Sequence, residues 1–483
     1  MTTQNEHGIL ATSRYVPRMR MERSEIYAQH RWMAPGLRSL AKGQKAMANW
    51  DEDSVTMAFE AARALDSDLT QVNSLTLSST SLPFAERTNA GIVASALNLS
   101  TNTLVRDVSS SYRAACTELL TNLMQAPKGF HLIAASEKRS PKPASTSEMI
   151  QGDGAAAVLT GTGPVIARLV ASHTEYADFV DHFRENGQSH EYGWEERWTR
   201  DEGYLKIAVR AIQKCLEQHS IKATDISHFV MPAVLTKINE VIAKKVGISQ
   251  AAITDTHRET VGDLGSAQPL AMLDTALRQA KAEELILLTC FGSGCDVLIL
   301  QRTSLPCPGN EPQHFKSENS YLKYLAFNQQ IELDWGMRAE MDNKTALTAA
   351  WRDHARISHF EGGQCKACGT VQFPSGRLCV NPQCNAQDSQ TPYSLVDEPA
   401  HILSHTSDFL AYTPHPPFQF GHIDFKSGAR VLMEFTDTDQ EELNSNLPVR
   451  MVYRIKEFDA KRGFRRYFWK ATPIRNHSQN QGT

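Results

Sequence analysis

The sequence lacks long apolar runs and an excess of one charge, and each absence excludes a class of protein. No stretch approaches the roughly 18 consecutive apolar residues that a membrane-spanning helix needs, and residues 1–21 lack the apolar centre of a signal peptide. The 50 lysines and arginines nearly balance the 54 aspartates and glutamates, so no general polyanion-binding surface is expected. We therefore expect a cytoplasmic protein without a membrane or nucleic-acid partner.

A regular disulfide framework is also absent. Of nine cysteines, four fall between residues 365 and 384 and the other five are scattered along the chain. The scattered ones are Cys116, Cys215, Cys290, Cys295 and Cys307. Disulfide scaffolds are short secreted chains with dense cysteines, so reduced thiols in a reducing compartment fit this pattern better.

The clustered cysteines predict a zinc ribbon. In CKACGTVQFPSGRLCVNPQC, Cys365 and Cys368 form one pair and Cys379 and Cys384 form a second, with ten residues between the two pairs. Each pair can offer two thiolates to one tetrahedral ion, which is the coordination that zinc prefers. Four sulfur ligands leave no position for water, so we expect a structural and not a catalytic zinc. The alternative is a ribbon that has lost its metal.

The chain is long enough for several domains. Up to about residue 305, short apolar runs alternate with helical patterns, which is typical of an α/β domain with buried strands. DVSSSYRAACTELLTNLMQA followed by QGDGAAAVLTG resembles VGDLGSAQPLAMLDTALRQA followed by FGSGCDVLILQ. This weak repeat predicts two similar halves, residues 1–160 and 161–305, although glycine turns can also be alike by chance.

Three further segments and a tail follow these halves. Residues 306–360 are predicted as a linker and a helical segment, with the helical pattern between Tyr321 and His354, and the ribbon occupies residues 361–390. Five short strand-like runs then predict a small β-barrel over residues 391–475. Residues 476–483 are predicted to be disordered. Some such barrels bind single-stranded nucleic acid, but here basic and aromatic residues interleave only in RGFRRYFWK.

The order of these motifs resembles a known family. The segments that carry the resemblance are YVPRMRM, NWDEDSVTMAFEAAR, LPFAERTNAGIVASALNL, DVSSSYRAACTELL, QGDGAAAVL, VGDLGSAQPLAMLDTAL and FGSGCDVL. They are similar to the thiolase superfamily, in its hydroxymethylglutaryl-CoA synthase and β-ketoacyl synthase III branch. Residues from about 318 onward resemble the zinc-ribbon and OB-barrel accessory proteins that partner thiolase-like enzymes. The resemblance implies a five-layered α/β/α/β/α fold, a homodimer through the thiolase-like domain, and carbon–carbon bond chemistry beside a coenzyme A thioester.

The nucleophile expected from this resemblance is displaced. The family places a cysteine five residues after the position of Asp107, and the residue there is Tyr112. Cys116 lies one helical turn further on, where a side chain is expected to point into the helix packing. The resemblance therefore leaves both Tyr112 and Cys116 as candidate catalytic residues.

The other catalytic positions of the family also differ in this chain. The position of the family's histidine corresponds to Pro232, and the third polar position corresponds to Gly262 or Asp263. Hydroxymethylglutaryl-CoA synthases have an acidic residue where this chain has Thr80, with no carboxylate beside it in the sequence. His257, Asp263 and Tyr192 are the remaining acid/base candidates.

Three functions stay open. The first is acyl transfer or thiolysis of a β-keto substrate, of the Claisen or retro-Claisen type, with acyl-CoA as substrate. In this reaction Cys116 would carry the acyl group after a small shift of register. The alternative for Cys116 is a thiol buried in the core. The second is a cysteine-independent retro-aldolase acting on a β-hydroxyacyl-CoA, with Tyr112 in acid/base catalysis, unless Tyr112 only fills the vacated pocket. The third is a non-catalytic acyl-CoA-binding scaffold of a thiolase complex. We rank acyl transfer first.

Two further segments carry candidate functional residues. HEYGWEERWTRDEGYLK, residues 190–206, combines aromatic and charged side chains, and we expect Tyr192, Trp194 and Arg200 to contact the substrate from a lid; a dimer interface or a charged helix start are the alternatives. The acidic residues 51–53 begin the helical pattern of residues 53–65. They are expected to cap this helix and not to catalyse.

Overall fold

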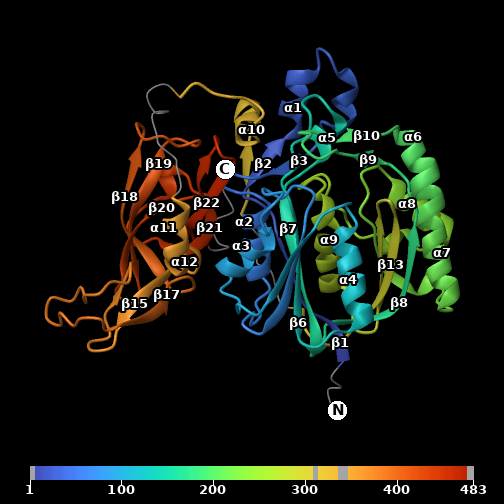
Figure 1. Cartoon of the computed structure of the whole chain (residues 1–483). Helices are drawn as coiled ribbons and strands as arrows, with labels where there is room; N and C mark the ends of the chain where they lie inside the picture. Colours follow the sequence, from blue (N-terminus) through green and yellow to red (C-terminus); the bar gives the residue numbers. More distant parts are fainter. Residues whose placement is uncertain (1–5, 308–313, 336–345, 476–483) are drawn as a thin grey trace. The chain divides into compact units, whose positions relative to one another are not determined.

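The computed structural model describes residues 6–307, 314–335 and 346–475 (Figure 1). The chain divides into two compact units, and we describe each by itself. The first comprises Met1–Ala48, Asp53–Ala94 and Leu99–Gln330, and the second comprises Asn49–Glu52, Ser95–Asn98 and Ile331–Thr483. Among the helices of the described residues, none has the length and apolar character to cross a bilayer.

A nine-stranded mixed sheet forms the centre of the first unit, in the order β11-β12-β13-β8-β1-β7-β6-β4-β5. Its strands are β1 Glu6–Tyr15, β4 Val72–Ser78, β5 Leu104–Val108, β6 Phe130–Glu137, β7 Gly154–Gly163, β8 Ala167–Tyr176, β11 Ile226–Val230, β12 Leu285–Phe291 and β13 Gly294–Arg302. Strands β12 and β13 are buried along nearly their whole length, as their continuous apolar sequences predict for strands covered on both faces.

The two halves of this sheet repeat one arrangement. In β1-β7-β6-β4 and in β8-β13-β12-β11, the first two neighbouring pairs are antiparallel and the third is parallel. Helix α4 (Ala114–Gln125) precedes β6, and helix α9 (Gln268–Gln279) precedes β12. The segments of the predicted repeat therefore occupy equivalent places in the two halves.

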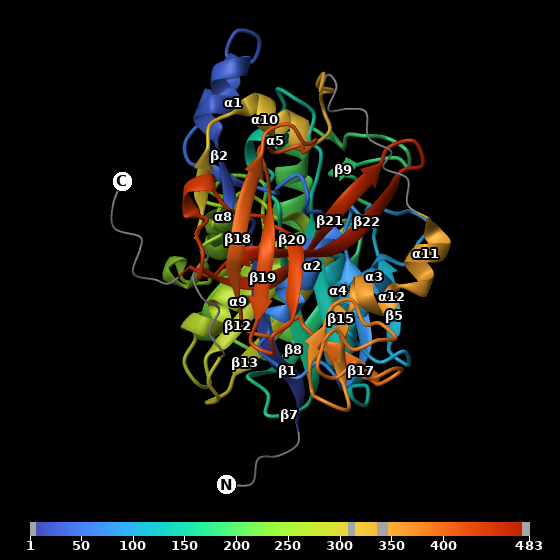
Figure 2. The ribbon, with the colours of Figure 1, turned by 90° about the vertical axis from the view of Figure 1, so that its left-hand side faces the viewer.

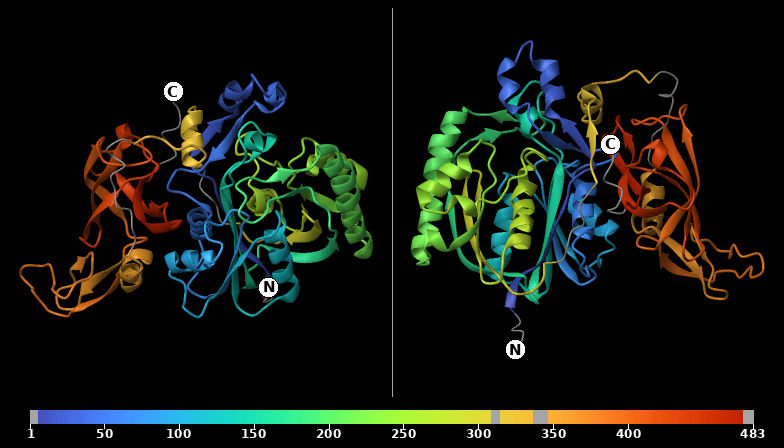
Figure 3. Two further views of the ribbon diagram at one scale, coloured as in Figure 1. Left: turned by 45° about the horizontal axis from the view of Figure 1, so that its top comes forward. Right: turned by 180° about the vertical axis from the view of Figure 1, so that it is seen from behind.

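Helices form three layers about the two halves of the sheet (Figures 1 and 3). Helices α4 and α9 lie side by side, and their apolar side chains share one core with β6, β7, β12 and β13. Helices α7 (Val209–Gln218) and α8 (Ile238–Val246) pack together in a second core, which includes side chains of β11, β12 and β13. Thr12 of β1 binds Asp274 of α9, and Ser13 binds Ala61 of α2 (Ser54–Arg63). Because successive strand residues face opposite sides, α2 lies on the outer face, and the order is helix, sheet, helix, sheet, helix.

Shorter elements complete the first unit. The three-stranded sheet β14-β2-β3 contains β2 Met19–Glu22, β3 Gln44–Met47 and β14 Lys316–Glu318. The helices are α1 Arg23–His30, η1 Pro35–Leu40, α3 Asn89–Ala96, α5 Thr146–Ile150, α6 Glu196–Trp198, η2 Thr199–Ala208, η3 Ala223–Asp225, η4 Gln250–Ala252, η5 Gly265–Ala267 and α10 Tyr321–Phe327. A two-stranded ribbon pairs β9 His182–Phe183 with β10 Tyr192–Gly193.

Two antiparallel sheets form most of the second unit. The smaller has the order β16-β15-β17, and the larger has the order β20-β19-β18-β21-β22. Figure 2 shows β18, β19 and β20 of the larger sheet side by side. The strands are β15 Glu361–Cys365, β16 Val371–Gln372, β17 Gln390–Ser394, β18 Ala400–Asp408, β19 Phe418–Phe425, β20 Arg430–Glu434, β21 Pro448–Asp459 and β22 Phe464–Pro473, and the helices are α11 Leu347–Arg352, α12 His354–Ser358 and η7 Gln440–Glu442.

The larger sheet contains all five strands that the sequence predicted after the ribbon. Just after β20, the Thr436 N–H donates to Ala471 O of β22 at 3.0 Å, so the two edges of this sheet approach each other. An OB-fold barrel over residues 391–475 stays a prediction, as do the domain boundaries. The predicted disordered tail, residues 476–483, lies outside the described residues, as do parts of the predicted linker and helical segment.

Candidate active site

Tyr112 lies in the turn between β5 and α4. Strand β5 ends at Val108 and α4 begins at Ala114. Arg113, the residue after Tyr112, connects this turn to the second half of the unit. Its Nε donates to Gly292 O (2.7 Å) and its Nη1 donates to Asp296 Oδ1 (2.7 Å). Asp296 is fully buried. The position of Tyr112 is therefore set by both halves of the first unit.

The phenol of Tyr112 donates a hydrogen bond of 2.8 Å to Glu191 Oε2. Its ring stacks on His182, with 4.3 Å between the ring centroids, and the Arg139 guanidinium carbon lies 5.1 Å from the Tyr112 centroid. Burial raises the pKa of the phenol well above its ordinary value; Arg139 opposes this rise and Glu191 adds to it. Tyr112 is therefore a protonated donor at neutral pH.

Glu191, which accepts the hydrogen bond of Tyr112, is an ionised carboxylate. Ser147 Oγ donates to Glu191 Oε1 at 2.9 Å, and Gln151 donates to the same oxygen. Burial by itself would raise the pKa of this carboxyl, but Arg139 and His182 together with the hydrogen bonds of Tyr112 and Ser147 leave it lowered. The sequence pointed to the segment of residues 190–206 but not to Glu191.

Arg139 links Tyr112 to Asp263. Its Nη2 donates to Asp263 Oδ2 at 3.0 Å and to the Asp263 carbonyl. Its Nε and Nη1 are buried and find no hydrogen-bond partner among the described residues. A Cβ at residue 265 would lie 3.2 Å from Arg139 Cζ, and the backbone there has a φ of +55°. Glycine therefore suits this position for two reasons: it leaves space for the guanidinium group, and it adopts the left-handed conformation without strain. Unpaired guanidinium N–H groups of a buried arginine suit an anionic oxygen.

A second carboxylate lies where the sequence shows none. Glu137, the last residue of β6, is fully buried and accepts hydrogen bonds from Thr80 N (2.9 Å), Ser81 Oγ (2.6 Å) and Ser266 Oγ (2.7 Å). The family's acidic position corresponds to Thr80 in the sequence, and a carboxylate from another strand contacts this residue. Sequence spacing could not reveal it, because residues 80 and 137 meet only when β4 and β6 pair.

Cys116 and His257 lie apart from Tyr112 and Glu191. Cys116 has no exposed surface, belongs to the core between α4 and α9, and has its thiol pKa raised by burial. His257 lies 3.2 Å from Arg14 Nη1 and 3.1 Å from Thr275 Oγ1. Burial, followed by Arg14, lowers the pKa of this imidazole. Of the residues proposed as catalytic, the structure brings Tyr112 and Asp263 together, through Arg139.

The three predicted substrate contacts do not gather around Tyr112. Tyr192 is 63% exposed and Trp194 is 48% exposed. Arg200 pairs with its neighbour Asp201 at 2.8 Å, at the surface. Their ring and ion-pair contacts are made mainly within residues 179–201. Contact of these side chains with a substrate stays a prediction.

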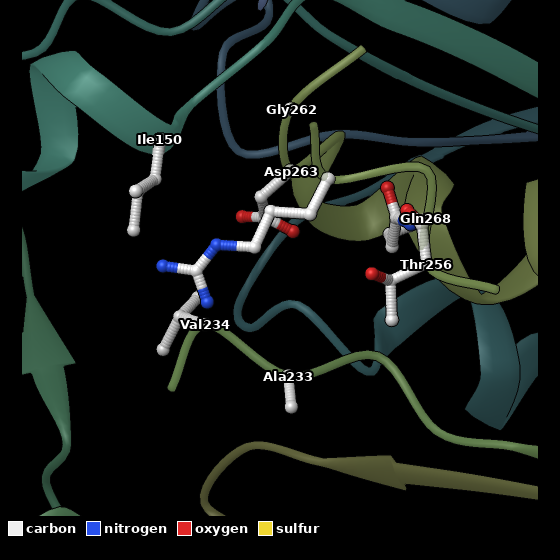
Figure 4. Close-up of a pocket in the computed structure, with 8 residues that line it drawn as sticks. Ile150, Ala233, Val234, Thr256, Gly262, Asp263 and Gln268 are labelled. Carbon is white, nitrogen blue, oxygen red and sulfur yellow. Dashed lines mark hydrogen bonds between the residues drawn. The ribbon is translucent and has the colours of Figure 1, made fainter. Parts of the chain in front are cut away.

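A small cavity lies beside Asp263 (Figure 4). Its volume is about 10 Å³, which is room for a single water molecule. It is lined by Ile150, Ala233, Val234, Thr256, Arg258, Gly262, Asp263 and Gln268. Figure 4 shows Thr256 and Gln268 together on one side and Ile150 and Val234 on the other. Ala233, one of the lining residues, follows Pro232, the position at which the resemblance to the family predicts a histidine.

The four clustered cysteines of the second unit have the geometry of a tetrahedral metal site. Their Sγ atoms all lie within 4.8 Å of one another. Cys365 and Cys384 are 3.9 Å apart and Cys368 and Cys379 are 3.6 Å apart, measured between Sγ atoms. Sulfurs bound at about 2.3 Å around a tetrahedral zinc would be about 3.8 Å apart. The four side chains therefore fit zinc.

Comparisons with known proteins agree with this architecture. A family model, 3-oxoacyl-[acyl-carrier-protein] synthase III C terminal, matches residues 216–299. A hydroxymethylglutaryl-CoA synthase of Aeropyrum pernix is 25% identical over 359 residues, which cover 72% of this chain and 97% of the relative.

Two solved structures share the fold. A 3-oxoacyl-(acyl carrier protein) synthase III of Pseudomonas aeruginosa superposes with a TM-score of 0.55 at 19% identity, over 62% of this chain and 99% of that one. An MvaS protein in complex with 3-hydroxy-3-methylglutaryl coenzyme A gives a TM-score of 0.53 at 15% identity, over 62% and 84% of the two chains. The shared part corresponds to the thiolase-like α/β fold of the first 300 or so residues.

Proposed function

The chain belongs to the thiolase superfamily, in the branch of hydroxymethylglutaryl-CoA synthase and 3-oxoacyl-[acyl-carrier-protein] synthase III, and we propose that it makes or cleaves a carbon–carbon bond beside a coenzyme A thioester. The names of the relatives support the thioester. One observation supports the type of reaction. Tyr112 lies in the turn where the resemblance to the family predicts a thiol, and its phenol donates a hydrogen bond to the ionised carboxylate of Glu191.

We infer that the reaction is a cysteine-independent retro-aldol cleavage of a β-hydroxyacyl thioester. Tyr112 accepts the proton of the β-hydroxyl group while its own proton passes to Glu191. The Cα–Cβ bond then breaks, a carbonyl compound leaves, and the electron pair of the bond forms the thioester enolate. Tyr112 next donates a proton to Cα, and the proton held by Glu191 returns to Tyr112, so that protons and electrons balance.

Arg139 supports this proposal electrostatically. Its Nε and Nη1, which find no hydrogen-bond partner among the described residues, carry three N–H groups. These groups are suited to the negative charge that develops on the thioester oxygen as the enolate forms. Fixed donors in a site that excludes water stabilise such an oxyanion strongly. Asp263 holds the third guanidinium nitrogen at 3.0 Å and keeps Arg139 in place.

Acyl transfer through Cys116 is the second candidate, and the names of the relatives favour it. Acyl transfer requires a thiolate that a thioester can reach. The fully buried thiol of Cys116, with its raised pKa, supplies this less readily than Tyr112 supplies a proton. The scaffold hypothesis remains the alternative if neither reaction is found.

We also propose a structural zinc ion on Cys365, Cys368, Cys379 and Cys384, and a homodimer through the first unit. The zinc proposal rests on the spacing of the four sulfur atoms. The dimer proposal is supported by β5, an edge strand of the sheet whose Leu104 is 63% exposed, because an open edge can pair with another strand. Size-exclusion chromatography with light scattering tests the dimer. A cytoplasmic location stays a prediction from the sequence.

The deciding experiment is to incubate the full chain with β-hydroxyacyl-CoA substrates in D₂O. A retro-aldolase releases a carbonyl compound and a shorter acyl-CoA that carries one solvent deuterium at Cα, and the intact mass of the protein does not change. Acyl transfer would instead add an acyl group to the protein. Failure to form either product over a broad panel of acyl chains would contradict both reactions and favour the scaffold.

A further inference from the structure

The second unit contains a larger cavity that the proposed reaction does not use. Its volume is about 120 Å³. A cavity of about 150 Å³ can hold a benzene molecule, so this one has room for a small organic ligand. The walls come from residues 49–51, 413, 415–419 and 434–440 and from Lys470. All of these residues belong to the second unit.

Asp51 is the key residue of this cavity. Its side chain is fully buried, and its Oδ2 accepts hydrogen bonds from Thr436 Oγ1 and from Lys470 Nζ, both at 2.9 Å. Its Oδ1 is buried and finds no hydrogen-bond partner among the described residues. Leaving a buried carboxylate oxygen unpaired is costly, so this atom requires a donor from a molecule inside the cavity.

The surroundings of Asp51 are more negative than positive. The lining includes four carboxylates and, among the described residues, one cationic side chain, that of Lys470. These carboxylates belong to Asp51, Glu434, Asp437 and Asp439. Lys456 pairs with Glu434, and Arg454 pairs with Asp437 but also with the buried Glu52. Four carboxylates thus line the cavity beside one lysine and one histidine, His415, which favours a cationic ligand.

The remaining walls suit an organic body. Trp50, Phe418, Pro416 and Pro417 line the cavity. Lys470 Nζ lies 4.3 Å from the centroid of the Trp50 ring, so this wall already accommodates an ammonium group beside an aromatic face. A bare inorganic cation would leave these apolar surfaces uncovered.

We propose that this cavity binds a small organic ammonium ligand, a primary amine of about four or five non-hydrogen atoms, which donates an N–H hydrogen bond to Asp51 Oδ1. The ligand leaves Lys470 and Thr436 on Oδ2 undisturbed. Its size limits its affinity, since a ligand of four such atoms binds with a Kd no tighter than roughly tens of micromolar. The site is separate from the Tyr112 turn and from the four cysteines, and it does not depend on the proposed reaction.

Isothermal titration calorimetry on the full chain tests the proposal, with ethanolamine and propylamine hydrochlorides as probes. We expect saturable binding with a Kd between tens of micromolar and a few millimolar, and a rise in Tm at saturating ligand. Tetramethylammonium, which has no N–H group, and potassium chloride at equal ionic strength should not bind. Absence of saturable amine binding to the folded wild type would overturn the proposal and leave a water-filled cavity.

Two variants locate the site. Asp51→Asn removes the charge and preserves the shape, and we expect at least a tenfold loss of affinity. Phe418→Trp enlarges a wall residue without touching the Asp51 hydrogen bonds, and it should weaken binding even if Asp51→Asn does not fold. Asp424→Asn, outside the cavity and paired with Arg430 at 2.7 Å, is the matched control and should bind as the wild type does. Equal amine affinity in all variants, or equal binding of potassium ions, would contradict the proposal.

Discussion

The phenol oxygen of Tyr112 lies 2.8 Å from Glu191 Oε2, although the two residues are 79 positions apart in the sequence. The pair joins a protonated donor to an ionised acceptor, because burial raises the pKa of Tyr112 while Arg139 and His182 outweigh burial and lower that of Glu191. Such a pair can move a proton in either direction without a thiol. This relationship underlies the proposed lyase reaction.

Replacing Tyr112 by phenylalanine tests the role of its hydroxyl. We expect Tyr112→Phe to lower kcat by about 10² to 10⁴, the usual range for the loss of general acid–base catalysis, with little change of KM. The measurement is steady-state cleavage of a β-hydroxyacyl-CoA, with deuterium incorporation at Cα as a second readout.

Tyr176→Phe is the matched control for that experiment, because Tyr176 is 81% exposed and lies at the end of β8, outside the candidate site. Its activity should stay within about twofold of the wild type. Unchanged kcat in Tyr112→Phe, with a circular-dichroism melting curve like that of the wild type, would exclude Tyr112 from the chemistry.

Cys116 should be dispensable for activity but not for stability. Cys116→Ala removes a buried sulfur from a close-packed core and is expected to cost about 1 kcal/mol, whereas Cys116→Ser buries a hydroxyl and costs about 1–3 kcal/mol. Urea unfolding measures both values. Loss of turnover in a well-folded Cys116→Ala, together with loss of a covalent acyl adduct by mass, would instead establish acyl transfer.

The ribbon cysteines should hold one zinc ion per chain. Metal analysis of protein purified under reducing conditions is expected to find it, and removal with a chelator should lower the Tm, because binding to the folded ribbon stabilises it. Cys379→Ser should lose the metal. Cys307→Ser, outside the cluster, should retain it, and a wild type that contains no zinc would contradict the prediction.

The lowered pKa of Lys45 predicts that the free energy of unfolding depends on pH. Its ammonium is almost fully buried and donates to Glu148 O (2.6 Å) and Tyr324 Oη (3.0 Å). Burial lowers its pKa from 10.5 to about 8, against the opposing charges of Asp153 and Glu148. Between these two values the unfolded chain binds the proton that the folded chain has released, so the free energy of unfolding rises with pH. The destabilisation that the buried ammonium of Lys45 causes is therefore fully present below pH 8 and decreases as the pH approaches 10.5.

The comparison of wild type with Lys45→Met isolates this effect. The difference in unfolding free energy, wild type minus variant, should increase in favour of the wild type between pH 7 and pH 10, by at most a few kcal/mol. Urea unfolding at each pH provides the measurement. Lys42→Met, a largely exposed lysine paired with Glu259, is the control. A difference that does not change with pH would exclude the lowered pKa.

Local features of the sequence predicted much of the fold. The acidic residues 51–53 are predicted to cap α2, and Asp53 does so by accepting from Val55 N and Thr56 N. The prediction is wrong for Asp51, which accepts from Thr436 and Lys470, and for Glu52, which accepts from Asn49 N. The cysteine spacing indicated the cluster. The turn containing Tyr112 followed from the strand-turn-helix pattern.

The composition of the candidate site could not be predicted in the same way. Glu191, Arg139 and Glu137 come from segments that meet only through tertiary packing, and no local pattern marks them. In residues 190–206 the aromatic side chains of Tyr192 and Trp194 stand out in the sequence as candidate substrate contacts, yet the neighbouring Glu191 accepts the hydrogen bond of Tyr112. Alternation along that segment cannot show which neighbour points inward, because tertiary contacts and not a regular strand or helix set the direction of each side chain.

Glu137 holds the two halves of the first unit together at the candidate site. Its carboxylate binds Thr80 and Ser81 of the first half and Ser266 of the second, so separating the halves there would expose a buried charge without its donors. His182, in β9, and Glu191, just before β10, belong by contrast to a two-stranded ribbon whose described ladder pairs are Tyr192 with Phe183 and Gly193 with His182. Because His182 stacks on the Tyr112 ring and Glu191 accepts the Tyr112 hydrogen bond, a movement of this ribbon would separate the phenol from the carboxylate that receives its proton.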